Sequence, residues 1–520
     1  MELWFKERLS SRIPRTRLYD PMSRAPPVDP EKIVELDYMS MCGLKTNELP
    51  DDIQAKLLKL LEQFGYIGDL ERFGKYMVAR YRSRACSETP KVLPSVLLPE
   101  KSMKRTKTPL ERLLNSKGFD DLRGAMPDLF KQSQDSGIGS SFSQTAISNA
   151  EDDKHKTYQM FYSPGTAVTY LAHRFPATYA SNFRVLMEVF KRVPDFNPTR
   201  ILDYGSGPGV STLAALKIWQ ADETRKVVCV EPSLNMQQVG NYLLSDSQAD
   251  LSWHIGLYGV SGQFDLITVS YVLMEIRDQD SRDLLINSLY SKLRPGGVLV
   301  ILDCGTPTGF RYIHRIREQL IIKQKEIKSD KNWHIIAPCS HENACPLALT
   351  GKDWCHFDQR VRRLPHSVYS KGSRKNNADY EKFSYLVIRK SPGPREIYGS
   401  ELEAPTSWEK SFFWPRIVMP AIKAGGHTLL DVCSTPNNFE RLVVSKSKPH
   451  AFGYRFSRKI MWGDLWRYPK RLARKEARES YTPDEVKQHL EMLHEDAKKA
   501  TKDISKFPDG KKLEEASYGQ

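Results

Sequence analysis

Four cysteines in the second half of the chain have the residue type and spacing of metal ligands: Cys339, Cys345, Cys355 and Cys433. The first three fall within 17 residues, and the fourth follows in a separate apolar stretch. Four thiolates from separate loops can each bind one iron of a [4Fe–4S] cluster. The same four could hold a tetrahedral zinc ion, with His341 or His356 in place of one thiolate. Buried thiols without a ligand are the third possibility, and spacing alone does not separate iron from zinc.

A glycine-rich turn is the second candidate site, because its residues could hold a nucleotide-like cofactor: Asp203, Tyr204, Gly205, Ser206, Gly207 and Gly209. A short apolar run ends in this turn and a helical pattern begins after it, as in the first strand, loop and helix of nucleotide-binding α/β sheets. Glycine lacks a Cβ, so the backbone can turn tightly and a ligand can lie against it. The amide groups that open the next helix then point toward that ligand.

The residues after this turn supply further elements of such a sheet. An apolar strand ends in Glu231, and an acid at this place suits the ribose hydroxyls of S-adenosylmethionine (SAM). A fourth strand is expected over 262–271, with Ser270 as a further cofactor-binding candidate, then a helix over 280–293 and a fifth strand over 293–303. This order predicts an α/β protein with a class I SAM-methyltransferase (Rossmann-like) sheet; a generic nucleotide-binding fold is the alternative.

The turn after the fourth strand lacks a recognisable methyl-acceptor motif. Methyltransferases that act on amino groups often carry an Asn/Asp-Pro-Pro-aromatic turn there, whereas this chain has Ser270-Tyr271-Val272-Leu273. A Pro-Cys pair, which would indicate attack on C5 of cytosine, is also absent from this turn. No general base or nucleophile follows from the sequence. Arg174, Thr178 and Tyr179, upstream of the sheet, either help to close the cofactor site or only pack a helix.

The composition points to an anionic partner. The 520 residues carry a formal net charge of +15, which suits nucleic acid, although adaptation to a compartment of basic proteins would give the same balance. With 40% apolar and 27% charged residues the chain resembles soluble globular proteins. No apolar run approaches the roughly 20 residues of a transmembrane segment. The eight cysteines are expected to be reduced thiols or metal ligands rather than disulfides.

We expect six segments in the following order: a helical N-terminal region (1–100), a partly disordered linker (101–155), a SAM-methyltransferase-like core (156–330), a cysteine-rich metal-binding insertion with a return strand (331–395), a small basic β module that closes the metal site (396–480), and a charged helix with a tail (481–520). The linker is assigned from its Ser, Gln, Asp and Gly content. The β module is assigned from short apolar runs separated by turns such as Gly425-Gly426.

The end of the β module combines positive charge with aromatic side chains. Residues 441–480 contain twelve Lys or Arg against three acids. Five aromatic residues are interleaved with them: Tyr454, Phe456, Trp462, Trp466 and Tyr468. Cations for phosphate and aromatic faces for unpaired bases predict an RNA surface. The alternative is that these aromatic residues pack beneath a basic face.

These motifs together resemble the mitochondrial methyltransferase-like protein 17 family, whose yeast relatives are known as mitochondrial small-ribosomal-subunit proteins. The resemblance covers roughly 156–468 and rests on specific motifs: Cys345-Pro346-Leu347, Asp353-Trp354-Cys355-His356-Phe357, Gln359-Arg360, Trp414-Pro415-Arg416-Ile417-Val418 and Lys459-Ile460-Met461-Trp462-Gly463-Asp464-Leu465-Trp466. It implies a [4Fe–4S] cluster on Cys339, Cys345, Cys355 and Cys433. It also implies binding to small-subunit mitochondrial rRNA and ribosomal proteins, with other assembly factors, in the mitochondrial matrix.

Three functions remain open from the sequence. The first is a SAM-fold, iron–sulfur, rRNA-binding factor that helps to assemble the small mitochondrial ribosomal subunit with little or no catalysis. The second is an active SAM-dependent rRNA methyltransferase of the same subunit. The third is a zinc-stabilised structural ribosomal protein. The missing acceptor motif favours the first, and the intact glycine turn keeps the second open.

Overall fold

The computed structural model describes ten stretches of the chain: 30–64, 74, 162–220, 223–276, 278–327, 332–351, 353–365, 377–436, 438–446 and 451–468. The expected linker (101–155) and the charged helix with its tail (481–520) lie outside these residues. The expected N-terminal region contributes two helices, α2 (Pro30–Ser40) and α3 (Asp51–Phe64). One face of α3 is apolar and packed against the fold, since Ile53, Leu57 and Leu60 are buried.

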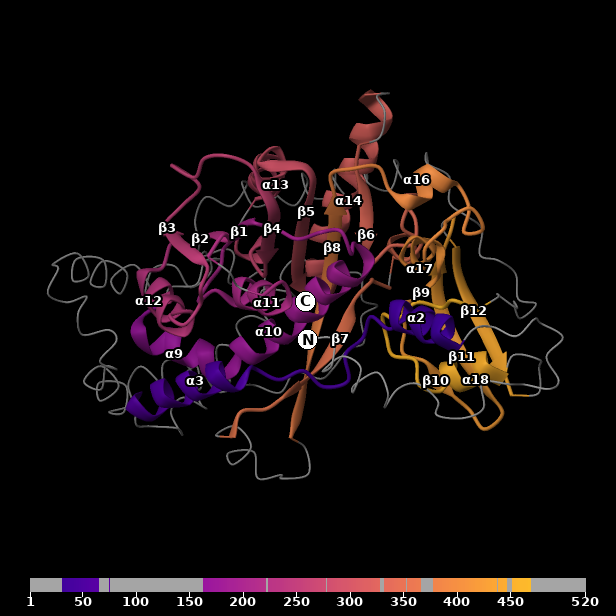
Figure 1. The fold of residues 1–520 in the computed structure, drawn as a ribbon, viewed down its shortest axis with the longest axis horizontal. Helices are drawn as coiled ribbons and strands as arrows, with labels where there is room; N and C mark the ends of the chain where they lie inside the picture. Colours follow the sequence, from indigo (N-terminus) through magenta and orange to yellow (C-terminus); the bar gives the residue numbers. More distant parts are fainter. Residues whose placement is uncertain are drawn as a thin grey trace, which may run out of the picture.

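An eight-stranded mixed sheet forms the centre of the molecule (Figure 1). Five parallel strands lie in the spatial order β3 (Asp250–His254), β2 (Lys226–Val230), β1 (Arg200–Tyr204), β4 (Phe264–Ser270) and β5 (Leu293–Cys304). Beyond β5 the antiparallel strand β8 (Ala378–Arg389) separates β5 from β6 (His334–Ala337), and β7 (Phe357–Arg362) pairs with the first half of β8.

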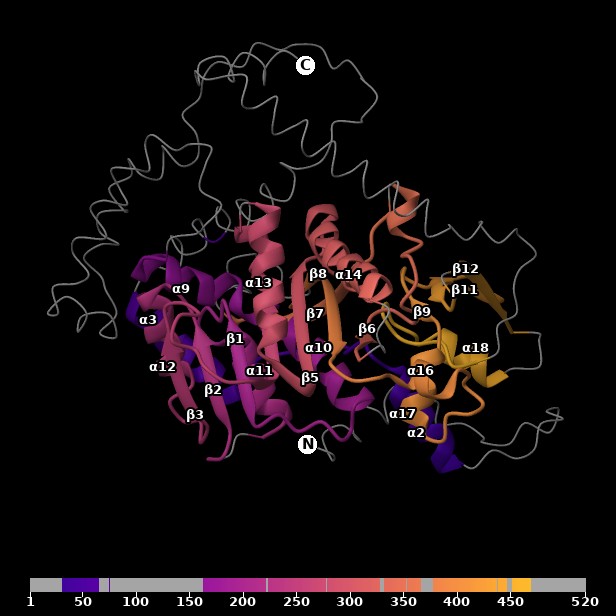
Figure 2. The same cartoon turned by 90° about the horizontal axis from the view of Figure 1, so that it is seen from above.

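Helices cover both faces of the main sheet (Figure 2), and side chains that alternate along the strands point into these two layers. Ile201 and Val300 belong to one hydrophobic cluster, whereas their neighbours Leu202 and Ile301 belong to another. The first cluster lies against α9 (Pro164–His173), α10 (Phe175–Arg192), α11 (Val210–Ile218) and α12 (Leu234–Leu243). The second lies against α13 (Gln279–Ser291) and α14 (Pro307–Ile327). Because both faces are covered, the central strands are apolar almost throughout.

A second, four-stranded antiparallel sheet lies beside the β6 edge of the main sheet (Figure 1). It consists of β9 (Arg416–Ile417), β10 (Ile422–Lys423), β11 (His427–Ser434) and β12 (Asn438–Ser445). The helix α18 (Ala451–Ser457) packs on it, and Phe456 and Trp466 are buried in its core. These two aromatic residues therefore follow the packing alternative rather than the predicted RNA surface.

Short helical segments complete the description: η1 (Leu273–Glu275), η2 (Ala348–Thr350), α16 (Pro394–Tyr398), α17 (Ser407–Lys410) and η3 (Ser411–Phe413). The seven cysteines in the described stretches are all unbridged. Within the same stretches, no helix combines the length and the apolar character needed to cross a bilayer.

Candidate cofactor and metal sites

The glycine turn between β1 and α11 has the open backbone that its sequence predicts. Gly205, Gly207 and Gly209 have φ angles of +66°, +53° and +77°, a region that side chains with a Cβ disfavour. A Cβ on Gly205 would lie 2.2 Å from Val272 Cγ2, whereas a Cβ on Gly207 would meet no atom within 4 Å. The space in front of Gly207 is therefore open to a ligand.

Glu231, directly after β2, contacts this turn. Its carboxylate accepts hydrogen bonds at 2.9 Å from the backbone N–H groups of Gly207 and Ser233. Burial raises the pKa of Glu231 to about 7, although these two hydrogen bonds act in the opposite direction. The structure therefore brings together the acid and the glycine turn that the sequence assigns to SAM.

Asp203 lies inside the fold rather than at the open face of the turn. Its carboxylate accepts from the backbone N–H of Thr212 at 3.1 Å and from the Thr212 and Thr268 hydroxyls at 2.8 Å. It thereby joins β1 to α11 and β4, and positions the turn without facing a ligand. Tyr204 is half-buried and Ser206 is buried. Ser270, at the end of β4, donates to Asn182 Oδ1 at 2.6 Å.

The turn after β4 is occupied by a connected polar network. Tyr271 has a φ of +59°, which is unusual for a residue with a side chain. Its hydroxyl donates to Glu381 of β8 at 3.0 Å and lies 3.0 Å from the Ser181 hydroxyl. Arg174 forms a two-point ion pair with the same Glu381, at 2.9 Å for both contacts, and its guanidinium lies 5.6 Å from the Tyr271 ring centroid.

This network decides between the two interpretations of the helix upstream of the sheet. Arg174 is paired with Glu381 of β8, which also accepts from Tyr271 just after β4. Thr178 donates to the Arg174 and Phe175 carbonyl oxygens, and Tyr179 is buried against Phe183. The packing alternative therefore holds for Thr178 and Tyr179.

The four candidate metal ligands line one internal cavity of about 40 Å³: Cys339, Cys345, Cys355 and Cys433. Cys339 and Cys345 follow β6, Cys355 precedes β7, and Cys433 comes from β11 of the second sheet. Two cations, Arg317 of α14 and Arg416 of β9, also line the cavity, and much of its remaining wall is apolar. The space exceeds the roughly 10–15 Å³ that one water molecule needs.

The thiols are near enough to influence one another. Burial raises the pKa of Cys345 to about 11 and raises the pKa values of Cys355 and Cys433 well above their usual range. Repulsion from neighbouring thiolates contributes to each of these three rises, while Arg317 or Arg416 opposes it. Thiolates are the ligands that soft metal centres prefer, so a donor set of this kind suits such a centre.

The two histidines considered as alternative ligands have different surroundings. His341 Nε2 lies 3.3 Å from Cys433 Sγ, and burial, together with Arg317, lowers the pKa of His341 to about 3. His356 instead stacks on Trp354, with ring centroids 5.0 Å apart, and contacts Trp462 at 4.6 Å. Among the described residues, no group of three or more His, Cys, Asp or Glu side chains is arranged to hold a metal ion.

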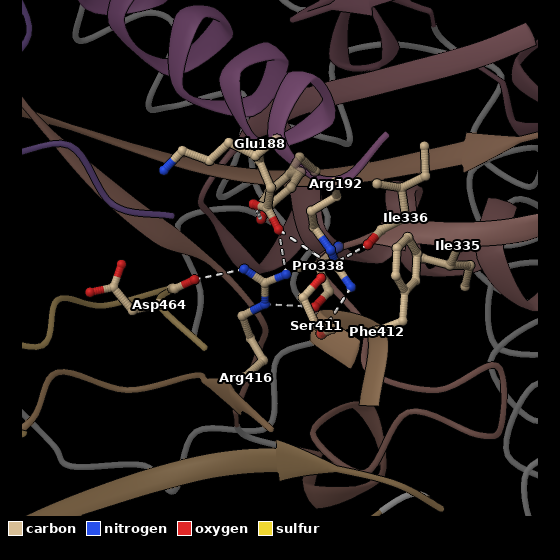
Figure 3. A network of polar contacts seen from close by, with 12 residues as sticks. Glu188, Arg192, Ile335, Ile336, Pro338, Ser411, Phe412, Arg416 and Asp464 are labelled. Carbon is tan, nitrogen blue, oxygen red and sulfur yellow. Dashed lines mark hydrogen bonds and ion pairs between the residues drawn. The ribbon is translucent and has the colours of Figure 1, made fainter. Parts of the chain in front are cut away.

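A buried charge network joins the second sheet to the main sheet beside the cavity (Figure 3). Arg416 donates to Glu188 of α10, to the Pro338 carbonyl oxygen at 2.8 Å and to the Gly463 carbonyl oxygen at 2.7 Å. Arg192, one turn further along α10, lies 3.5 Å from the same Glu188 carboxylate. Pro338 precedes Cys339, and Arg416 is paired in register with Cys433. The network therefore positions two of the four thiol-bearing segments.

The charges in this network are compensated by partners within the protein and not by water. Glu188 and Arg416 are each 1% exposed. Burial would raise the pKa of Glu188, but Arg416, Arg192 and a hydrogen bond from Tyr385 overcome it and lower that pKa. The sequence alone gave Glu188 and Arg416 no role in a site. A signal was present, since Glu188 lies between Val185 and Val189 on a helix with an apolar pattern.

The strand order, the single antiparallel strand inserted beside β5, and the glycine turn facing an acid after β2 define a class I SAM-dependent methyltransferase fold. Within that class, residues 164–467 match the family described as Mitochondrial small ribosomal subunit Rsm22. Because this match spans more than half of the 520 residues, the chain belongs to that family.

Two individual relatives show how similar the chain is to single proteins. The chain is 28% identical over 327 residues to Rsm22-cox11 tandem protein 2, mitochondrial, of Schizosaccharomyces pombe, covering 58% of this chain and 43% of that protein. It is also 28% identical over 318 residues to the Homo sapiens Ribosome assembly protein METTL17, mitochondrial, covering 59% and 64%. The chain thus spans less than half the length of the first relative.

Among solved structures, the ribosomal protein L11 methylase from Lactobacillus delbrueckii subsp. bulgaricus is similar, with 15% identity and a TM-score of 0.24. The similarity covers 41% of this chain and 80% of that one. The class of fold rests on the strand order and not on this likeness.

Proposed function

We propose that the protein helps to assemble the small subunit of the mitochondrial ribosome, in the mitochondrial matrix, by binding its rRNA. Membership of the Rsm22 family and the names of its relatives support the ribosome as partner. The net charge of +15 supports an RNA contact. Small-subunit ribosomal proteins and other assembly factors are the further partners of this proposal.

The proposed cofactor of the main sheet is SAM. Glu231 would bind its ribose hydroxyls, and the open space at Gly207 would admit the ligand against the backbone. Tyr204, Gly205, Ser206, Gly209 and Ser270 would border the same site, and Asp203 would hold its floor. When bound, SAM would supply a sulfonium methyl group.

One observation carries the proposal that little or no methyl transfer follows: the acceptor turn is committed to internal contacts. Tyr271 is bound to Glu381 and Ser181, and Ser270 is bound to Asn182. Glu381 is itself held by Arg174 in a two-point ion pair. A target base would have to displace this network before it reached the methyl group.

The proposed metal centre is a [4Fe–4S] cluster on Cys339, Cys345, Cys355 and Cys433. In such a cluster each thiolate binds a different iron, so the sulfur atoms surround a cavity instead of converging on one point. A tetrahedral zinc ion on the same residues is the alternative centre. Arg317 and Arg416 would balance the negative charge of the thiolates.

RNA crosslinking of the tagged protein from gradient-fractionated mitochondria tests the partner. We expect crosslinks concentrated on small-subunit rRNA in fractions that precede the mature subunit. Crosslinks spread over messenger or transfer RNA, away from those fractions, would overturn the assembly proposal.

The second candidate function is an active rRNA methyltransferase, which the open space at Gly207 favours. We expect the map of rRNA methyl groups to stay unchanged when Gly207→Asp replaces the natural protein. If a mapped methyl group disappears while the variant still associates with the subunit, catalysis is established and the non-catalytic proposal fails.

A further inference from the structure

A second cavity lies on the surface where the main sheet meets the second sheet, apart from both candidate cofactor sites. Its volume is about 470 Å³, within the range of roughly 300–1,000 Å³ that small ligands occupy. Its walls come from four parts of the chain: the segment between α2 and α3, the β7–β8 hairpin, the β9–β10 connection, and the residues after α18. We call it the junction groove. It exists only when the two sheets are docked.

The junction groove is lined by more positive than negative charge. Lys45, Arg360 and Lys423 are exposed cations in its wall, and Asp358 is the acid among its lining residues. Within the described part of the chain, neither Arg360 nor Lys423 has an ion-pair partner. The neighbouring Arg362, two residues along β7, differs because it pairs with Glu48. The groove therefore presents charge that its own residues leave uncompensated.

An exposed tyrosine ring lies beside these cations. Tyr380 is 59% exposed, and on β8 it lies directly opposite Arg360 of β7. Residues paired in this way have Cβ atoms about 4.5–5.5 Å apart, so the phenol ring and the guanidinium are neighbours. Trp462 forms part of the wall and is held by its contact with His356. An open aromatic face next to unpaired cations matches the surfaces that stack bases and bind phosphates.

We propose that the junction groove binds a single-stranded segment of RNA, with one unpaired base stacked on Tyr380 and its flanking phosphates on Arg360 and Lys423. This inference rests on the proposed function, since it locates where the rRNA is contacted. A duplex fits this surface less well, because its bases are stacked on one another and offer no face to Tyr380.

The test uses the full chain and two probes, a labelled single-stranded oligouridine of about 12 nucleotides and an RNA duplex of the same length. Tyr380→Ala should weaken binding of the single strand about tenfold or more, because one stacked base is lost, whereas Tyr380→Phe should keep the affinity. Arg360→Glu combined with Lys423→Glu should weaken it further and make log K less dependent on log salt by about 1.4. Unchanged thermal melting would show that each variant folds.

Two control variants carry changes of the same kind elsewhere, the truncation of a tyrosine and the reversal of a single charge. Tyr258 is fully exposed, and Lys226 lies at the start of β2; neither lines the groove. Tyr258→Ala and Lys226→Glu should leave RNA binding unchanged.

Four outcomes would overturn the groove proposal. In the first, the groove variants bind the single-stranded RNA as tightly as the natural protein does. In the second, the control variants weaken this binding as much as the groove variants do. The third is a duplex bound as tightly as the single strand, and the fourth is free uridine monophosphate that binds as tightly as the oligomer. If the natural protein binds neither probe nor small-subunit rRNA, the proposed function fails as well, so the two failures are distinguishable.

Discussion

The two candidate cofactor sites are built in opposite ways. The SAM site is formed largely by segments that are close in the sequence: β1, the glycine turn and the acid after β2 lie within residues 200–231. The cysteine cavity collects three thiols from the segment between β6 and β7 and a fourth from the second sheet, and Cys433 lies 94 positions after Cys339 in the sequence. Local backbone geometry shapes the first site, whereas the second exists only when distant segments have docked.

The forces that hold the two sites differ accordingly. At the glycine turn, backbone N–H groups donate to Val230 and Glu231, so the site is part of the sheet itself. At the cavity, Arg416 and Glu188 are buried charges whose desolvation is offset only while every partner is in place. We therefore expect the cavity side of the molecule to be the more sensitive to single substitutions.

The largest effect is expected from removing a cavity thiol. Cys433→Ser or Cys355→Ser should abolish the proposed cluster and loosen β9–β12, because the link between the insertion and the second sheet is lost. Iron and sulfide analysis with limited proteolysis measures both changes. Cys304→Ser is the matched control, since Cys304 is a half-buried thiol that does not line the cavity. Unchanged iron content and protease resistance in both cavity variants would refute the cluster.

The buried network should give the next largest effect. Arg416→Met leaves Glu188 buried without its main cation, which costs about 3–5 kcal/mol of unfolding free energy. Urea unfolding measures this loss, and adding Glu188→Gln should recover part of it. The control is Arg441→Met, because Arg441 pairs with Asp431 on the same sheet but its side chain is 55% exposed; it should cost less than about 1 kcal/mol. Equal losses in the two variants would contradict the comparison.

At the SAM site the expected effect depends on pH. The folded state raises the pKa of Glu231 from 4.5 to about 7, so it holds the proton more tightly than the unfolded chain does. This contributes roughly 3 kcal/mol below pH 4.5, and the contribution is lost as the pH rises to 7. Urea unfolding of Glu231→Gln and of the natural protein at pH 5 and pH 8 isolates the contribution of Glu231. Burial also raises the pKa of Asp303 to about 7, but Asp303 is present in both proteins, so its contribution cancels.

The same ionisation should govern ligand binding. Hydroxyl groups donate more strongly to a carboxylate than to a carboxylic acid, so SAM affinity should increase as the pH rises through about 7. Calorimetric titration with SAM measures this increase. A pH-independent affinity that is also unchanged in Glu231→Gln would remove Glu231 from the cofactor site.

The smallest effect on stability is expected at Gly207. Alanine there meets no atom within 4 Å, so Gly207→Ala should cost only the left-handed backbone penalty of about 1–2 kcal/mol. It should nevertheless weaken SAM binding, because the methyl group enters the open space. Gly205→Ala is the paired variant, with a clash at 2.2 Å from Val272, and should lower the melting temperature more. Full SAM affinity in Gly207→Ala would place the ligand elsewhere.

Much of the main sheet could be predicted from the sequence. The strands expected at 262–271 and 293–303 correspond to β4 and β5, and the helix expected at 280–293 corresponds to α13. These elements have long apolar or helical patterns that local physics favours. The short strands β6 and β7 were not predicted, and Gln359, buried on β7, interrupts the apolar alternation that would have indicated a strand.

The sequence by itself determined the glycine turn and the strand that ends in Glu231, because residue type and local spacing control backbone conformation, and it singled out four cysteines as candidate ligands. Only the tertiary structure decided which groups meet. Glu381 reaches Tyr271 across 110 positions, and Arg416 reaches Glu188 across 228. The physical reason is that a charge is buried only where a distant partner compensates its desolvation, and the spacing of neighbouring residues does not specify that partner.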